Sequence, residues 1–68
     1  MRVTGKVKFF NTDKGYGFAT RDDGKGDVFL HITELRKAEL DDLQPDDKIS
    51  FVPQETRKGS RATELRVL

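Results

Sequence analysis

Aromatic and cationic side chains are concentrated in one short stretch of this chain. Five of the six phenylalanine and tyrosine residues lie within residues 9–29, and the single histidine, His31, follows them. Lysines stand among these rings, at Lys8 and Lys14. Flat apolar rings stack unpaired nucleic-acid bases, and neighbouring cations neutralise phosphates. This combination predicts a surface that binds single-stranded nucleic acid.

The spacing of the rings predicts that they share one face of a sheet. Tyr16 and Phe18 are two residues apart, and so are Phe29 and His31; alternate residues of a strand point to the same side. The residues that alternate with them are small or aliphatic: Gly17, Ala19, Val28, Leu30 and Ile32. We therefore expect an aliphatic interior and rings on the outside, where base stacking gives exposed rings a purpose. The alternative, that the rings are core residues, is weaker because the opposite face already supplies a core.

Two features beside these rings bear on the binding surface. Gly15 and Gly17 flank Tyr16 and add no bulk, so we expect them to let a base approach closely. Phe9 and Phe10 are adjacent, and strict alternation places them on opposite faces. The sequence leaves open which of these two phenylalanines meets the ligand.

Five extended segments must position these side chains. They cover residues 2–10, 16–21, 27–32, 48–54 and 62–68. Polar, glycine-containing turns separate the first three, and the Asp-Gly pair at 23–24 favours a hairpin. In the last segment, Thr63, Leu65 and Val67 are expected to share one side. Short strands at this spacing predict an all-β barrel or sandwich.

Residues 33–47 form a long acidic connection between the third and fourth segments. Thr33 is expected to cap a short helical turn, which Pro45 would prevent from extending far. Leu35, Leu40 and Leu43 are expected to hold the connection against the barrel. The simpler interpretation of its acidic residues is a solvated loop without a specific role.

Size, charge and cysteine content limit the possible functions. The chain has 68 residues, a formal net charge of +1 and no cysteine, which excludes disulfides and thiolate metal sites. The charges are separated, because residues 1–21 and 57–66 are basic and residues 34–47 are acidic. We expect one domain, without a signal peptide or membrane contact, that works in the cytoplasm.

No catalytic site is predicted. The chain has one histidine and no cysteine, and no nucleophile is spaced to pair with a base. The aspartate pairs 41–42 and 46–47 lack the ligand spacing of a calcium loop. We therefore expect no enzyme activity, catalytic residue, metal, cofactor or small-molecule substrate. A protein-binding barrel whose acidic loop faces a basic partner remains the alternative function.

Two motifs give the sequence a family resemblance. Lys-Gly-Tyr-Gly-Phe at 14–18 matches the start of the RNP1 pattern of RRM domains. Ala19 and Arg21 then depart from that pattern, and the chain has no room for the two helices of an RRM. The whole chain more closely resembles the bacterial cold-shock domain, with 5–11 like its first strand, 14–19 like its RNP1 and 28–32 like its RNP2.

The resemblance implies a five-stranded antiparallel OB-type barrel and a function. A protein of this kind binds single-stranded RNA and DNA with low sequence preference, acts as an RNA chaperone or modulator of transcription or translation in the cold-shock response, and is expected to be a monomer. The contacts carried over are Lys8, Phe9, Phe10, Lys14, Tyr16, Phe18, Asp27, Phe29, His31 and Lys58. Arg61, a further flanking cation, joins them, as do Ile32 and Leu40, which stand where the family carries rings. Phe9 replaces the family's usual tryptophan, and Ser60 replaces a common proline.

Overall fold

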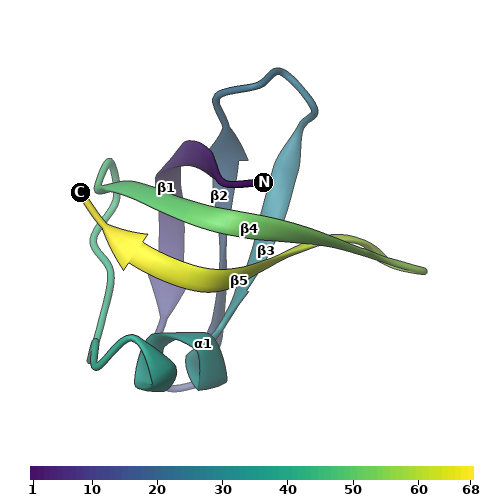
Figure 1. Cartoon of the computed structure of the whole chain (residues 1–68). Coiled ribbons are helices and arrows are strands. Elements are labelled where there is room, and N and C mark those ends of the chain that lie inside the picture. The colour runs from purple at the N-terminus through teal and green to yellow at the C-terminus, as the bar shows by residue number, and fades with distance from the viewer.

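Five strands in the order β1-β2-β3-β5-β4 close into a barrel in this computed structural model, which describes residues 1–68 (Figure 1). The strands are β1 (Val3–Asn11), β2 (Tyr16–Arg21), β3 (Asp27–His31), β4 (Lys48–Thr56) and β5 (Gly59–Val67). One helix, α1 (Ile32–Lys37), follows β3 and covers one end of the barrel. The all-β, five-stranded OB-type barrel is thus confirmed.

One of the strand pairings differs from the antiparallel barrel expected. β3 pairs with β5 in parallel, through Val28 with Ser60 and Phe29 with Arg61, whereas the other four pairings are antiparallel. The reason is geometric: a closed ring with an odd number of strands cannot reverse direction at every pair. At least one parallel seam is therefore unavoidable once five strands close.

The interior contains the aliphatic face predicted for β2 and β3. Ala19, Val28 and Leu30 are fully buried, together with Ile49 and Phe51 from β4. Burying a side chain of this size contributes about 1.5–3 kcal/mol relative to leaving it exposed. This interior fixes which way the alternate residues of each strand point, and it leaves the rings outside.

The predicted side of the last strand is wrong from its middle onward. Ser50 of β4 pairs with Arg66 and Val52 pairs with Thr63, so β5 carries an extra residue between these pairs. Glu64 lies in this bulge with φ of 49°. The bulge reverses the alternation, and as a result Leu65 is buried in the core whereas Thr63, before the bulge, is only partly buried. Val67 lies opposite the buried Ile49 but is exposed, at the end of the strand.

The connection after β3 packs as predicted, but its cap differs. Leu35 and Leu43 are buried and Leu40 is partly buried against the core. The N-cap of α1 is His31 and not Thr33, because Nδ1 of His31 accepts a hydrogen bond from the Thr33 backbone N–H at 3.2 Å. The helix therefore begins two residues earlier than expected. At six residues it falls well below the length of a membrane span, and the chain has no other helix.

Candidate nucleic-acid interface

Five rings lie together on the outer side of β1, β2 and β3. Across the strands, Phe9 pairs with Phe18 and Phe18 pairs with Phe29, with ring centroids 5.9 and 5.6 Å apart. Tyr16 pairs with His31 one step along the strands, and its ring stacks on Phe29 at 6.1 Å and an interplanar angle of 18°. We call these five residues the ring face. The predicted common side of the four rings in β2 and β3 is confirmed.

Phe9 reaches the ring face because β1 has a bulge. Val7 pairs with Ala19 but Phe9 pairs with Phe18, so Lys8 is an extra residue in the ladder. Without it, Phe9 would follow Val7 into the core. Phe10 instead lies partly buried against the core. The structure therefore puts Phe9 on the ring face and leaves Phe10 off it.

The rings are packed against each other but not covered. Phe9 is 42% exposed, and the other four members of the ring face are half-buried. Three of the six neighbouring ring pairs meet edge to face, as for Phe18 and Phe29 at 70°, an arrangement that stabilises aromatic clusters. Each ring thus has a fixed place and still presents apolar surface to the solvent. Such a surface is suited to stacking flat apolar groups.

The expected role of the glycines beside Tyr16 is wrong for Gly17. Gly17 is buried, and a Cβ there would lie 2.3 Å from the backbone oxygen of Phe9 and 2.7 Å from Cα of Phe10. The backbone of β1 passes so close to Gly17 that no side chain fits there. This glycine is therefore required for strand packing and not for the approach of a base. Gly15 has φ of 77°, which allows the tight turn between β1 and β2.

Charged members of the predicted site surround the ring face. Lys8 donates a hydrogen bond to Asp27 at 3.0 Å, and both side chains are about half exposed. Lys14 is exposed in the β1–β2 turn and Lys58 in the β4–β5 turn. Arg61 pairs in register with Phe29, next to the rings. Of these cations, the sheet register places Arg61 beside Phe29 of the ring face, and Lys14 and Lys58 are exposed in turns that join the strands.

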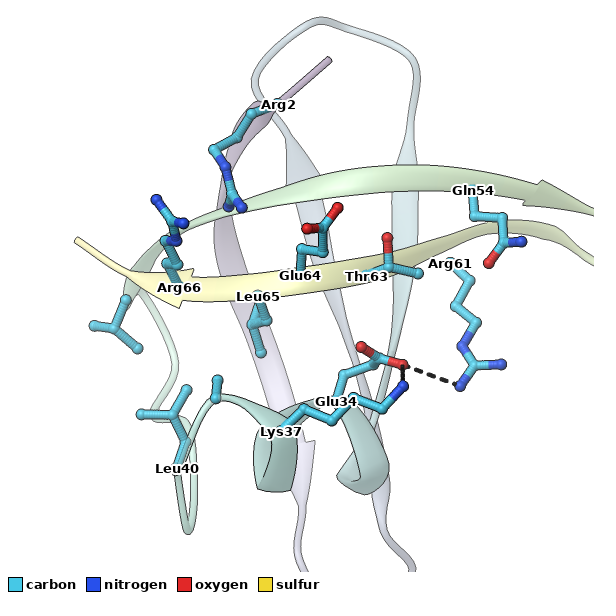
Figure 2. A pocket seen from close by; sticks show the side chains of 12 residues that line it. Arg2, Glu34, Lys37, Leu40, Gln54, Arg61, Thr63, Glu64, Leu65 and Arg66 are labelled. Carbon is cyan, nitrogen blue, oxygen red and sulfur yellow. Dashed lines mark hydrogen bonds and ion pairs between the residues drawn. The ribbon is translucent and has the colours of Figure 1, made fainter.

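Three predicted contacts are not brought to the ring face. Phe10, Ile32 and Leu40 all lie partly buried against the hydrophobic core. Ile32 begins α1, beside Gly15. Leu40 follows the helix and lies across α1 from Arg61 (Figure 2). An apolar side chain gains more from burial than from exposure, which accounts for the inward packing of these three residues.

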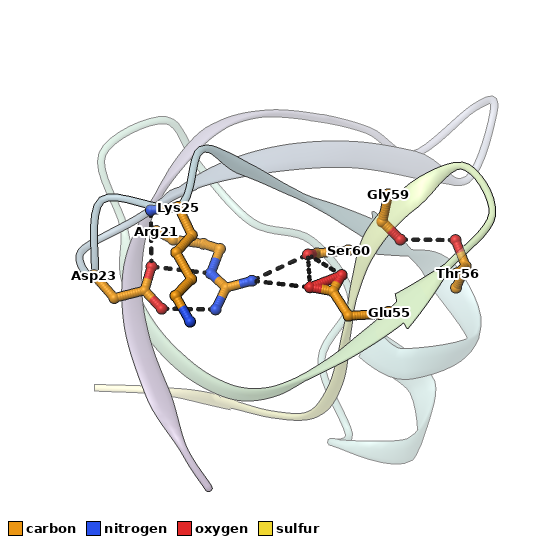
Figure 3. Close-up of polar contacts among 7 residues, drawn as sticks. All are labelled: Arg21, Asp23, Lys25, Glu55, Thr56, Gly59 and Ser60. Carbon is orange, nitrogen blue, oxygen red and sulfur yellow. Dashed lines mark hydrogen bonds and ion pairs between the residues drawn. The ribbon is translucent and has the colours of Figure 1, made fainter.

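A buried arginine, shown in Figure 3, was not predicted from the sequence. Arg21 is buried, and its guanidinium makes two hydrogen bonds to Asp23, at 3.1 and 2.6 Å, and one to Ser60 at 3.0 Å. Ser60 in turn donates to Glu55. Arg21 falls on the inward side of β2 with Ala19 and Gly17, and a charge at an inward position was the available signal.

This polar cluster connects two turns. It links Asp23 in the β2–β3 turn to Glu55 and Ser60, which pair next to the β4–β5 turn that carries Lys58. The hydrogen bond from Arg21 lowers the pKa of the Asp23 carboxyl, because it favours the charged form. A bidentate bond to a carboxylate also restrains orientation. The cluster therefore closes the barrel where β3 and β5 share only two paired positions.

An aromatic face on a closed five-stranded barrel defines a nucleic-acid-binding domain of the OB type. The comparisons specify the family. The model of the 'Cold-shock' DNA-binding domain matches residues 3–68. The chain belongs to the cold-shock domain family, whose members bind nucleic acid and are not enzymes.

Curated relatives agree with this assignment over at least 96% of their length. The chain is 46% identical over 68 residues to a cold shock-like protein of Aquifex aeolicus, covering 100% of this chain and 97% of the relative. It is 40% identical over 67 residues to the cold shock-like protein CspG of Escherichia coli K12, covering 98% and 96%. It is 39% identical over 64 residues to the probable cold shock protein A of Mycolicibacterium smegmatis, covering 94% and 96%.

Proposed function

We propose that this protein binds single-stranded RNA and DNA on the ring face. The observation that carries the proposal is the half-exposed group of five rings on the outer side of β1, β2 and β3. An unpaired base can lie flat on such a ring, whereas a base inside a duplex is already stacked on both sides. Single strands are therefore the form of nucleic acid that this surface selects.

Low sequence preference follows from the chemistry of the surface. Every base has an apolar face, so stacking on Phe9, Phe18 or Phe29 discriminates little among bases. Polar groups able to contact base edges are few at the ring face, and Asp27 and His31 are already engaged with Lys8 and Thr33. Affinity then comes mainly from stacking and from phosphate neutralisation by the surrounding cations.

The cellular role we propose is that of an RNA chaperone, or of a modulator of transcription or translation, in the cold-shock response. A ligand that binds only the open form of a hairpin shifts its equilibrium toward opening by mass action. Weak RNA structures would open first. We further propose that residues 1–68 act as one binding domain, in the cytoplasm, as a monomer and without a cofactor.

A hairpin-opening assay tests this role. A weak RNA hairpin carries a fluorophore and a quencher at its two ends, and added protein is expected to raise the fluorescence. The matched control is the double variant Phe18→Ala, Phe29→Ala, which keeps all cations but lacks two stacking rings, with thermal melts to show that it folds. Equal opening by both proteins would contradict stacking as the mechanism.

A further inference from the structure

Figure 2 shows a groove beside α1 and β5. It has a volume of about 920 Å³ and contains none of the five rings. Four cations and two carboxylates line it, together with short polar and aliphatic side chains. The cations are Arg2, Lys37, Arg61 and Arg66. Stacking of bases on the ring face does not use this groove. Arg61, however, belongs both to the predicted binding residues and to the lining of the groove.

The register of the sheet connects the two surfaces directly. Phe9, Phe18 and Phe29 are opposite one another on three strands, Arg61 is opposite Phe29, and Gln54 is opposite Arg61. Opposed residues of paired strands point to the same side of a sheet. One outer row of side chains therefore runs from the rings to Arg61 and Gln54, which both line the groove.

Arg61, at the junction, has unused hydrogen-bonding capacity. Its guanidinium reaches Glu34 and Thr33 only at 3.5 Å, at the outer limit for a hydrogen bond. Its Nε is buried and has no partner, which costs free energy unless a ligand or solvent supplies an acceptor. A phosphate oxygen is an acceptor that suits a guanidinium.

The two carboxylates of the groove offset half of its positive charge and leave a formal net charge of +2. Glu34 is buried, and its carboxylate lies 3.5 Å from both Lys37 Nζ and Arg61 Nη2. Its charge is therefore already offset within the protein. Glu64 is the one exposed carboxylate of the groove. The groove as a whole is complementary to an anion.

We propose that this groove binds the sugar-phosphate backbone of the same single strand whose bases stack on the ring face. The strand passes Arg61 as it leaves Phe29 and continues along Lys37 and Arg66. This inference rests on the proposed binding of single strands, and it extends the binding site from the ring face into the groove. It predicts that strands longer than the ring face gain affinity from phosphate contacts in the groove.

The test compares a short oligothymidine of about four nucleotides with a long one of about ten, within the range of site sizes on OB-type folds. Binding is followed by the fluorescence of Tyr16, the single tyrosine in a chain without tryptophan. The groove variant is Lys37→Gln, Arg66→Gln, both at exposed positions. The control variant is Lys25→Gln, Arg36→Gln, which changes the net charge equally at exposed positions outside the groove.

The groove variant is expected to bind the long strand about tenfold more weakly at low salt, as for two lost phosphate contacts, and the short strand like the unchanged protein. The control variant is expected to bind both like the unchanged protein. In addition, Glu64→Gln removes the exposed carboxylate and is expected to tighten the long strand by about threefold. A gain of this kind cannot arise from loss of folding.

Other outcomes overturn the proposal in distinguishable ways. Unchanged binding of the long strand by the groove variant would remove the groove from the site but leave stacking on the ring face intact. Equal losses in the groove and control variants would show a general effect of charge. A different result would be that the unchanged protein and the control variant bind polyglutamate and the groove variant does not, while all three bind the long strand equally. This result would assign the groove to an acidic protein partner. Failure of the unchanged protein to bind either strand would refute the proposed function itself.

Discussion

The ring of Phe9 lies 5.9 Å from that of Phe18, centroid to centroid, on the outside of the barrel. Strict alternation along β1 would carry Phe9 inward after Val7, and the bulge at Lys8 prevents this. Phe10 takes up the partly buried position instead. Two adjacent phenylalanines thus have separate roles, which mutation can distinguish.

Phe9→Ala is expected to weaken binding of a short oligothymidine by about 1–3 kcal/mol, the cost of one lost stack, and to leave the melting temperature nearly unchanged. Phe10→Ala is expected to do the reverse and cost about 1–3 kcal/mol of stability, less than a fully buried phenylalanine. Paired titrations and thermal melts measure both effects. If Phe10→Ala weakens binding more than Phe9→Ala does, the ligand contacts the Phe10 side of β1 and not the ring face.

Phe29→Ala is expected to weaken binding by about 1–3 kcal/mol while the barrel stays folded, because Phe29 lies at the centre of the ring face. Its matched control is Phe51→Ala. Phe51 is fully buried, so this change is expected to cost about 3–5 kcal/mol of stability. Urea titrations give the stabilities. If Phe29→Ala unfolds the protein as readily as Phe51→Ala, the rings are core residues.

Binding of a short strand is expected to weaken as salt rises. Each neutralised phosphate of a single strand contributes about −0.7 to the slope of log affinity against log salt, so a few contacts give roughly −1.5 to −3. Lys14→Gln is expected to make the slope shallower by about 0.7, because Lys14 is exposed beside Tyr16 and has no ion pair. Lys25→Gln, in the β2–β3 turn, is the control. A slope near zero would mean that the lysines are only solvated.

The protein is expected to lose stability in acid through Asp22 and Asp23. The hydrogen bond from Lys48 lowers the pKa of Asp22, and the bond from Arg21 lowers the pKa of Asp23, both below the usual 3.8. The folded state therefore binds these protons less readily than the unfolded state. Their contribution is complete above pH 3.8 and disappears as the pH falls through the lower folded-state pKa values.

Melting temperatures measured from neutral pH downward check this expectation. Asp23→Asn is expected to melt lower than the unchanged protein at neutral pH, and the difference should shrink below pH 3.8. Asp13→Asn, at an exposed position without an ion pair, is the control. A difference that stays constant down the pH range would show that the Asp23 charge contributes nothing.

Local alternation in the sequence predicted those parts of the fold that depend on neighbouring residues alone. Tyr16 and Phe18 share a face because β2 is regular, and the alternation of Val28 and Leu30 defines the interior in the same way. The bulges at Lys8 and Glu64 were not predictable, because a bulge depends on how two strands pair. Each reverses the side of every residue that follows it.

The remaining differences also arise from long-range structure. The parallel pairing of β3 with β5 follows from the closure of five strands into a ring. The number of strands implies one parallel pair, but only the closed barrel shows which two strands form it. The partners of buried Arg21 lie in a turn and in a strand 39 residues further along the chain, which local patterns do not reveal. Leu40 packs inward because the barrel end beside α1 offers apolar surface.

We propose above all that the exposed rings select unpaired bases. The most direct measurement is a titration of Tyr16 fluorescence with a short single strand and with a duplex of equal length, at one salt concentration. The single strand is expected to change the fluorescence and to bind much more tightly than the duplex, whose bases cannot lie on the rings. Equal affinity for both forms would contradict the account and leave only a basic surface.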